Sequence, residues 1–273
     1  MSTSSGRGGF LVSAYSLVRR SGFLRTSLGR RLFKSAYFAY KRYVEDDLRG
    51  LVISHPALVG GGNVLDIGAN IGYTAAVLAR ASEPDREVYA FEPEPFNFSI
   101  LQQTARQAEF EGRIAPLQLA VGAEDGTVNL WINDRHHADH RVATERFRSA
   151  HEGAKEVSVS LVSIDSFLES KPGPVSFVKI DVQGYELAVC QGMQITLRQN
   201  PDIAVVLEFM PSAMRELGFE PSHLIDFFAE RDFKIYEIHS RGKLSPGMPA
   251  VMKDSSYFNL LFSRRSIACG REA

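Results

Sequence analysis

Acidic residues and glycines close three short apolar runs of this 273-residue chain. The three segments are residues 64–73, 88–93 and 177–186. Glycine lets a ligand approach the backbone closely, and a helix that follows such a turn offers amide donors. A carboxylate at a strand end can accept hydrogen bonds from two neighbouring hydroxyl groups. The three segments therefore predict a site for a ligand with a polar tail and a hydroxyl-bearing ring.

The first segment runs from an apolar strand through a glycine turn into a helix. A dinucleotide site prefers G-x-G-x-x-G, and that glycine pattern is absent here. Asp66 with Gly68 and Gly72 instead favours a zwitterionic amino-acid tail, because a carboxylate then lies beside backbone donors. The residues of this turn that are predicted to bind the ligand are Asp66, Gly68, Ala69, Asn70, Gly72 and Tyr73.

Acidic residues also end the second and third segments. Glu92 and Pro93 close the second, and the Glu92 carboxylate is predicted to accept hydrogen bonds from paired ribose hydroxyls, as in dinucleotide folds. Asp181 ends the apolar strand of the third, and Glu208 ends the next predicted strand. Adjacent strand ends of a parallel sheet share one crevice, so these side chains should face the same ligand.

The order of these segments resembles that of the FkbM methyltransferases. The residues that carry the resemblance are Asp66-Ile-Gly68-Ala-Asn70-Ile-Gly72, Phe91-Glu92-Pro93, Ala120-Val-Gly122, Ser163-Ile-Asp165, Lys179-Ile-Asp181-Val-Gln183-Gly184-Tyr185-Glu186 and Leu207-Glu208-Phe209. The similarity extends over residues 51–262. Two positions depart from the family pattern, which commonly has Glu where Gln183 stands and a small residue where Tyr185 stands.

The resemblance implies a class I S-adenosylmethionine-dependent methyltransferase. The expected fold is α/β and Rossmann-like, with a mostly parallel sheet of the seven-stranded type, helices on both faces, an antiparallel C-terminal strand and a helical N-terminal extension. The implied donor is S-adenosylmethionine, with its adenine near Val121. The implied acceptor is a hydroxyl group of a small molecule, natural product or glycan. A dinucleotide- or nucleotide-sugar-binding oxidoreductase and a non-catalytic donor-binding module are the alternatives.

Methyl transfer to an alcohol needs a base, and three residues are candidates. Asp181 is the first choice for orienting the acceptor or removing its proton, and Glu208 is the second, because burial would raise the pKa of a carboxylate in such a cleft. Asp181 alternatively fixes a turn or binds the amino group of the donor. His137, in the polar interval 133–156, is the third, as part of a loop that closes over the acceptor. Lys179 fits a structural ion pair as well as a catalytic one.

The same interval raises the question of a metal. It contains His136, His137 and His140, but metal-binding histidines need a rigid frame, and the interval has the polarity of an exposed loop. No metal site is predicted.

Short apolar runs alternate with helical patterns from Leu51 onward, which predicts a parallel sheet covered on both faces. Strands are predicted at 63–67, 87–91, 115–121, 127–132, 157–164, 175–180, 203–209, 234–238 and 257–262. Helices are predicted at 73–81, 95–109, 185–197 and 222–230. Residues 51–273 are expected to form the S-adenosylmethionine-binding domain, and residues 1–50 a basic helical extension.

Charge is distributed unevenly, although the formal net charge is only -1. Residues 1–44 contain nine Lys and Arg and no Asp or Glu, so the rest of the chain carries 22 basic against 32 acidic residues. A body with this acidic excess is not expected to bind nucleic acid, because phosphate binding needs a basic face. The basic segment has three interpretations: helices that cover an edge of the domain, a peripheral contact with anionic lipid, or an organelle transit peptide.

The two cysteines, Cys190 and Cys269, match no metal-ligand spacing and are expected to remain reduced. The chain has no apolar run of the roughly 18 to 20 residues that a membrane-spanning helix needs. We therefore expect a cytoplasmic protein.

Overall fold

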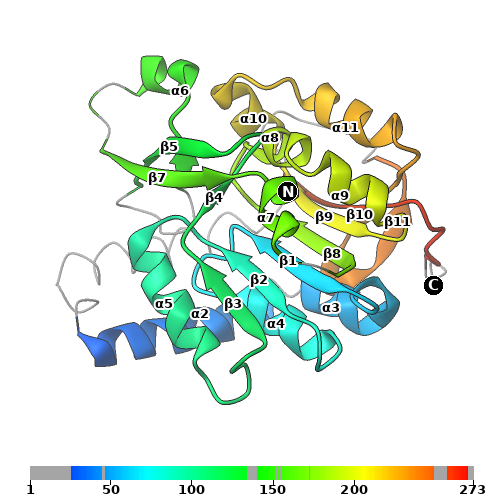
Figure 1. Ribbon diagram of the computed structural model, residues 1–273, viewed down its shortest axis with the longest axis horizontal. Coiled ribbons are helices and arrows are strands. Elements are labelled where there is room, and N and C mark those ends of the chain that lie inside the picture. The colour runs from blue at the N-terminus through cyan, green and yellow to red at the C-terminus, as the bar shows by residue number, and fades with distance from the viewer. Residues whose placement is uncertain are drawn as a thin grey trace, which may run out of the picture.

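An eight-stranded sheet forms the centre of the computed structural model (Figure 1). The structure describes residues 26–44, 47–133, 140–151, 153, 155–171, 173–248 and 257–269. The sheet order is β11-β10-β12-β9-β8-β1-β2-β3. The strands are β1 Asn63–Ile67, β2 Val88–Phe91, β3 Ile114–Leu117, β8 Val175–Ile180, β9 Ala204–Phe209, β10 Lys234–Ile238, β11 Leu244–Pro246 and β12 Phe258–Ser263. The strands from β3 to β9 are parallel, and β12 is antiparallel to both its neighbours, which confirms the predicted sheet.

Helices cover both faces of this sheet, because successive side chains of its central strands point to opposite faces and both sets are apolar. Leu65 and Ile67 of β1 pack into a core with α7, α8, α9, α10 and α11, whereas Val64 packs on the other face with α3, α4 and α5. The helices are α2 Ser27–Val44, α3 Asp47–Ser54, α4 Tyr73–Ala81, α5 Pro95–Ala105, α6 Glu145–Ala150, α7 Ile164–Glu169, α8 Glu186–Gln191, α9 Gln194–Gln199, α10 Pro211–Leu217 and α11 Pro221–Ala229.

A second, four-stranded sheet is inserted between β3 and β8 (Figure 1). Its order is β4-β7-β5-β6, and its strands are β4 Ala120–Val121, β5 Gly126–Trp131, β6 Arg141–Val142 and β7 Glu156–Val162. The predicted strand over 115–121 is therefore wrong in extent: the chain divides there into β3 and β4, which belong to different sheets. The apolar pattern continues from β3 into β4, so the sequence does not indicate that β4 pairs with strands of a different sheet.

Two further predictions need correction. The interval 133–156 is not a loop throughout, because β6 and α6 lie in its second half. The Thr144 side chain caps α6 by accepting a hydrogen bond from the Phe147 amide at 3.2 Å. The Phe147 side chain is buried, so its apolar contacts stabilise a segment that is otherwise largely polar. The predicted helix 185–197 is two helices separated at Gly192, whose Cα packs against the carbonyl of Gly122.

The helix α2 packs against the body of the protein. The Phe38 ring meets the Tyr73 ring of α4 edge-on, with 5.3 Å between centroids. The next helix, α3, spans the predicted domain boundary at residue 50, and its Leu51 and Val52 are buried in the core. No helix in the described ranges is long and apolar enough to cross a membrane.

Gly68 brings the glycine turn against the end of β8. Its φ is +78°, and a Cβ at this position would overlap the carbonyl oxygen of Asp181. Gly61 has a similar φ of +85° but opens onto free space, so it is a matched control. We expect Gly68→Ala to lower the free energy of unfolding by about 1–3 kcal/mol more than Gly61→Ala, because only the first adds a steric overlap to the backbone strain. Urea denaturation of both variants measures the difference, and equal losses would contradict the close approach.

Candidate active site

The carboxyl ends of β1, β2, β8 and β9 meet at one edge of the sheet, and two adjoining cavities lie there. The larger has a volume of about 500 Å³ and the smaller about 80 Å³. Both are lined by Gly68, Asn70, Asp181 and Gln183, so a single elongated ligand can extend from one into the other. The glycine turn and the third segment predicted from the sequence therefore share one cleft.

The smaller cavity is lined by Glu92, Pro93 and Val121, all three of which were predicted to bind the donor, Glu92 at its ribose and Val121 near its adenine. Glu92 is buried, and its two carboxylate oxygens accept hydrogen bonds from the amides of Asn70 at 2.8 Å and Glu94 at 3.0 Å. Burial raises the pKa of Glu92 to about 8, although both amide hydrogen bonds act to lower it. The carboxylate thus ties the end of β2 to the glycine turn at the wall of the cavity.

Because Glu92 is predicted to accept hydrogen bonds from ribose hydroxyls, its raised pKa predicts a specific pH dependence of donor binding. Hydroxyl donors on a ligand stabilise the ionised carboxylate, so binding should lower the pKa of Glu92 and release a proton at neutral pH. We expect the affinity for S-adenosylhomocysteine to increase from pH 6 to about 8, by up to about tenfold per pH unit, and to level off above. Calorimetry in buffers of different ionisation enthalpy measures the proton release, and an affinity independent of pH over this range would contradict the assignment.

A buried ion-pair network connects the two cavities to the core. The Lys179 ammonium donates a hydrogen bond to the Gly68 carbonyl at 2.9 Å and lies 3.4 Å from an Asp66 oxygen and 3.5 Å from an Asp181 oxygen. Asp66 is fully buried and lines neither cavity. Asp66 therefore lies beneath the turn beside the Lys179 ammonium and not on the wall of either cavity, where the sequence analysis expected it, and burial raises its pKa. Lys179 itself reaches the larger cavity.

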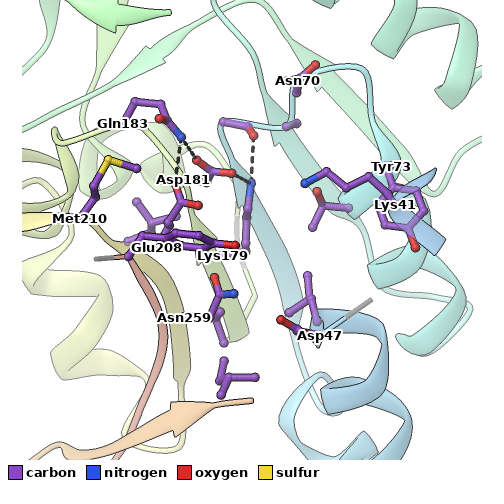
Figure 2. Close-up of a pocket in the computed structure, with 18 of the residues that line it drawn as sticks. Lys41, Asp47, Asn70, Tyr73, Lys179, Asp181, Gln183, Glu208, Met210 and Asn259 are labelled. Carbon is purple, nitrogen blue, oxygen red and sulfur yellow. Dashed lines mark hydrogen bonds and ion pairs between the residues drawn. The ribbon is translucent and has the colours of Figure 1, made fainter. Parts of the chain in front are cut away.

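Asp181 and Glu208 lie together at the ends of β8 and β9, as predicted (Figure 2). The Gln183 amide nitrogen joins them, donating to Asp181 at 2.7 Å and to Glu208 at 2.9 Å. Burial acts to raise the pKa of Asp181, but the Lys179 ammonium, the Gln183 hydrogen bond and the Lys41 charge outweigh it, so its pKa falls below the ordinary value. Burial and the neighbouring Asp181 carboxylate raise the pKa of Glu208 to about 8. At neutral pH the pair holds one negative charge, on Asp181.

The other residues predicted from the glycine turn divide into two groups. Ala69, Asn70 and Tyr73 line the larger cavity with Gly68, whereas Gly72 begins α4 and lines neither cavity. The side-chain oxygen of Asn70 is buried and has no hydrogen-bond partner among the described residues.

His137 lies outside the described residues, so its predicted role stays a prediction. His140, which is described, lines the smaller cavity, and its Nδ1 accepts a hydrogen bond from the Asn133 amide at 3.1 Å. In the described part of the chain, no three His, Cys, Asp or Glu side chains are grouped as a metal site would require.

Several residues of the larger cavity were not predicted from the sequence. They are Tyr37 and Lys41 of α2, Asp47 and Leu48 of α3, Arg141 of β6, and Met210, Tyr257 and Asn259 near β9 and β12. The first four belong to the predicted extension, residues 1–50. Its amphipathic pattern predicts helices but does not indicate which part of the protein they pack against. Arg141 comes from the insertion, where the polar composition concealed a strand.

The sheet order, with antiparallel β12 between β9 and β10, and the glycine turn at the end of β1 define the fold of the class I S-adenosylmethionine-dependent methyltransferases. Residues 66–235 match the model of the methyltransferase FkbM domain, and the chain belongs to that family. The resemblance predicted from the sequence is thus confirmed, and the oxidoreductase alternative is set aside.

A relative and two solved structures show how far the similarity extends. The hexuronic acid methyltransferase AglP of Haloferax volcanii is 29% identical over 135 residues, 49% of this chain and 50% of that protein, so the chain spans about half the length of this relative. A methyltransferase FkbM from Methylobacillus flagellatus KT has a TM-score of 0.47 at 17% identity, over 74% of this chain and 43% of that one. The O-methyltransferase TomG of Streptomyces achromogenes, in complex with SAM, has a TM-score of 0.45 at 13% identity, over 80% and 78% of the two chains.

Proposed function

We propose that this protein transfers a methyl group from S-adenosylmethionine to a hydroxyl group of a sugar, in a glycan or a glycosylated small molecule. The observation that carries the proposal is the place of Asp181, which follows β8 and lines both cavities where they adjoin. Membership of the FkbM family supports methyl transfer. The hexuronic acid named as the substrate of the Haloferax volcanii relative supports a sugar acceptor.

The residues present fit this donor at both ends. Glu92 places a buried carboxylate where ribose hydroxyls can donate to it, and Val121 and Tyr185 offer apolar surface for a base in the same smaller cavity. The backbone amides of the glycine turn, which lines both cavities, suit the carboxylate group of the amino-acid tail. The cavities adjoin at Gly68 and Asp181, which is where the sulfonium between tail and ribose would lie.

S-Adenosylmethionine, when bound, supplies an activated methyl group: the acceptor oxygen bonds to the methyl carbon, the carbon–sulfur electron pair stays on sulfur, and the hydroxyl proton leaves to a base. The protein has to orient the acceptor oxygen and accept that proton. Orientation contributes on the order of 7 to 11 kcal/mol in such reactions. Asp181, ionised at neutral pH and open to the larger cavity, is the proposed base.

The neighbours of Asp181 keep it ionised, but the expected increase of its pKa by burial is not found: Lys179, Gln183 and Lys41 lower the pKa instead, which makes Asp181 a weaker base than the sequence predicted. Lys179 stabilises its negative charge, and Gln183 fixes its position by bonding to Glu208 as well. A Glu at position 183 would add a third carboxylate here, whereas the Gln183 amide donates to both. Glu208, protonated at neutral pH, can donate a hydrogen bond to an acceptor oxygen without competing for its proton.

Donor binding and turnover test the proposal separately. Pure protein should bind S-adenosylhomocysteine in calorimetry, and radiolabelled S-adenosylmethionine should transfer label to members of a panel of p-nitrophenyl glycosides. Failure to bind S-adenosylhomocysteine would refute the donor assignment. Binding without transfer to any glycoside would refute the sugar acceptor and favour the non-catalytic module.

A further inference from the structure

The helix α2 contributes a wall to the larger cavity. Tyr37 and Lys41 lie four residues apart, which places them on the same face of the helix, and both line the cavity. The exposed residues Leu32 and Tyr43 do not line it. None of the three interpretations of the basic segment from its sequence includes a place in the active site.

The charge of Lys41 acts on the catalytic end of the sheet. It helps to lower the pKa of Asp181 and opposes the increase in the pKa of Glu208, and all three residues line the larger cavity. Figure 2 shows the Lys41 side chain extending from the α2 wall into the cavity towards Lys179 and Asp181. Arg141, from β6 of the insertion, adds a third cation to the lining beside Lys41 and Lys179, and it pairs with Glu216 of α10.

The two lysines of the cavity come from different elements, and the Lys41 ammonium lies over the Tyr37 ring, 5.9 Å from its centroid. Lys179 is buried on β8 and is engaged with the Gly68 carbonyl, Asp66 and Asp181, so it belongs to the internal network. Lys41 is half-buried and stands on a wall that the sheet does not provide. The Asp181 carboxylate would repel the negative charge of an anionic acceptor. A cation on another wall of the cavity can bind the charged group of the acceptor at a distance from Asp181 and so reduce this repulsion.

Resting on the proposed function, we infer that Lys41 binds the carboxylate of an acidic sugar, so that the acceptor is a uronic acid residue and α2 is part of the acceptor site. The Tyr37 ring lies one turn away on the same helix, and Tyr257 lies on the lining near β12. Because the Lys41 ammonium lies over the Tyr37 ring, these two side chains form one surface of the cavity wall. The Tyr257 ring adds an aromatic face that a sugar can contact. A charge-assisted contact between ammonium and carboxylate selects the uronic acid over the neutral hexose.

The experiment compares p-nitrophenyl β-D-glucuronide with p-nitrophenyl β-D-glucoside, and the corresponding galacturonide with the galactoside, as acceptors for wild type, Lys41→Met and Lys41→Arg. We expect wild type to prefer the uronides. In Lys41→Met, kcat/KM for a uronide should fall roughly 10- to 150-fold more than kcat/KM for the matching hexoside, the range of a lost charged hydrogen bond. Lys41→Arg should recover a large part of the preference, because it keeps the charge.

Arg42→Met is the matched control, since Arg42 is exposed on the same helix and does not line the cavity. It removes one positive charge from α2 and should leave the preference unchanged. Equal losses on uronide and hexoside in Lys41→Met would overturn the inference, since Lys41 would then act through Asp181 alone. A loss of S-adenosylhomocysteine affinity in Lys41→Met would also overturn the inference, because Lys41 would then bind the amino-acid tail of the donor.

Two outcomes separate this inference from the proposed function. If wild type binds S-adenosylhomocysteine and methylates only neutral glycosides, the proposed function holds and the acidic acceptor is refuted. If wild type does not bind S-adenosylhomocysteine, the proposed function itself fails.

Discussion

Asp181→Asn is expected to lower kcat by about 10²- to 10⁴-fold, the usual contribution of a positioned general base. The amide keeps the size and one hydrogen-bond acceptor of the side chain but cannot take the acceptor's proton. Affinity for S-adenosylhomocysteine should change only slightly, because Glu92, Asn70 and the glycine turn remain. Steady-state kinetics with saturating glycoside measures the first effect, and calorimetry measures the second.

The control for this variant is Asp202→Asn, because Asp202 is an exposed acid that pairs with Arg265 away from the cavities. It should leave kcat unchanged. If Asp181→Asn keeps kcat within a few fold of wild type, Asp181 is not the base and its carboxylate only holds Lys179 and Gln183 in place.

Glu92→Gln is expected to weaken the binding of S-adenosylhomocysteine by roughly 10- to 150-fold, the range of a lost hydrogen bond to a charged group. The amide NH₂ would also face the backbone N–H of Asn70 or Glu94, where the carboxylate now accepts. The increase of affinity towards pH 8 should disappear in this variant, because the titrating group is gone.

The control for Glu92 is Glu109→Gln, since Glu109 is an exposed acid that pairs with Arg80. That substitution should leave donor binding as in wild type. A Glu92→Gln protein that binds S-adenosylhomocysteine with wild-type affinity and wild-type pH dependence would show that the ribose lies elsewhere.

The sequence predicted those parts of the molecule that depend on local pattern. The bounds of β1, β8, β10 and α4 agree with the predicted ranges, because each is a short apolar run or an amphipathic stretch bounded by turn residues. Glu92, Asp181 and Glu208 were found because acids that end parallel strands share an edge of the sheet.

What the sequence could not predict depends on contacts between distant segments. Asp66 has the same position in the motif whether it faces a ligand or Lys179, and only the fold decides that it is buried. The positions of Lys41 and Arg141 follow from where α2 and the inserted sheet pack, which an amphipathic or polar stretch does not specify. The bridge that Gln183 makes between two carboxylates likewise appears only once β8 and β9 are neighbours.

The most direct test is a crystal structure of the protein with S-adenosylhomocysteine bound. The ribose hydroxyls should lie within hydrogen-bond distance of the Glu92 carboxylate, and the sulfur should face Asp181 at the junction of the two cavities. A nucleoside bound away from Glu92, or a sulfur directed away from Asp181, would contradict the assignment of this cleft to methyl transfer.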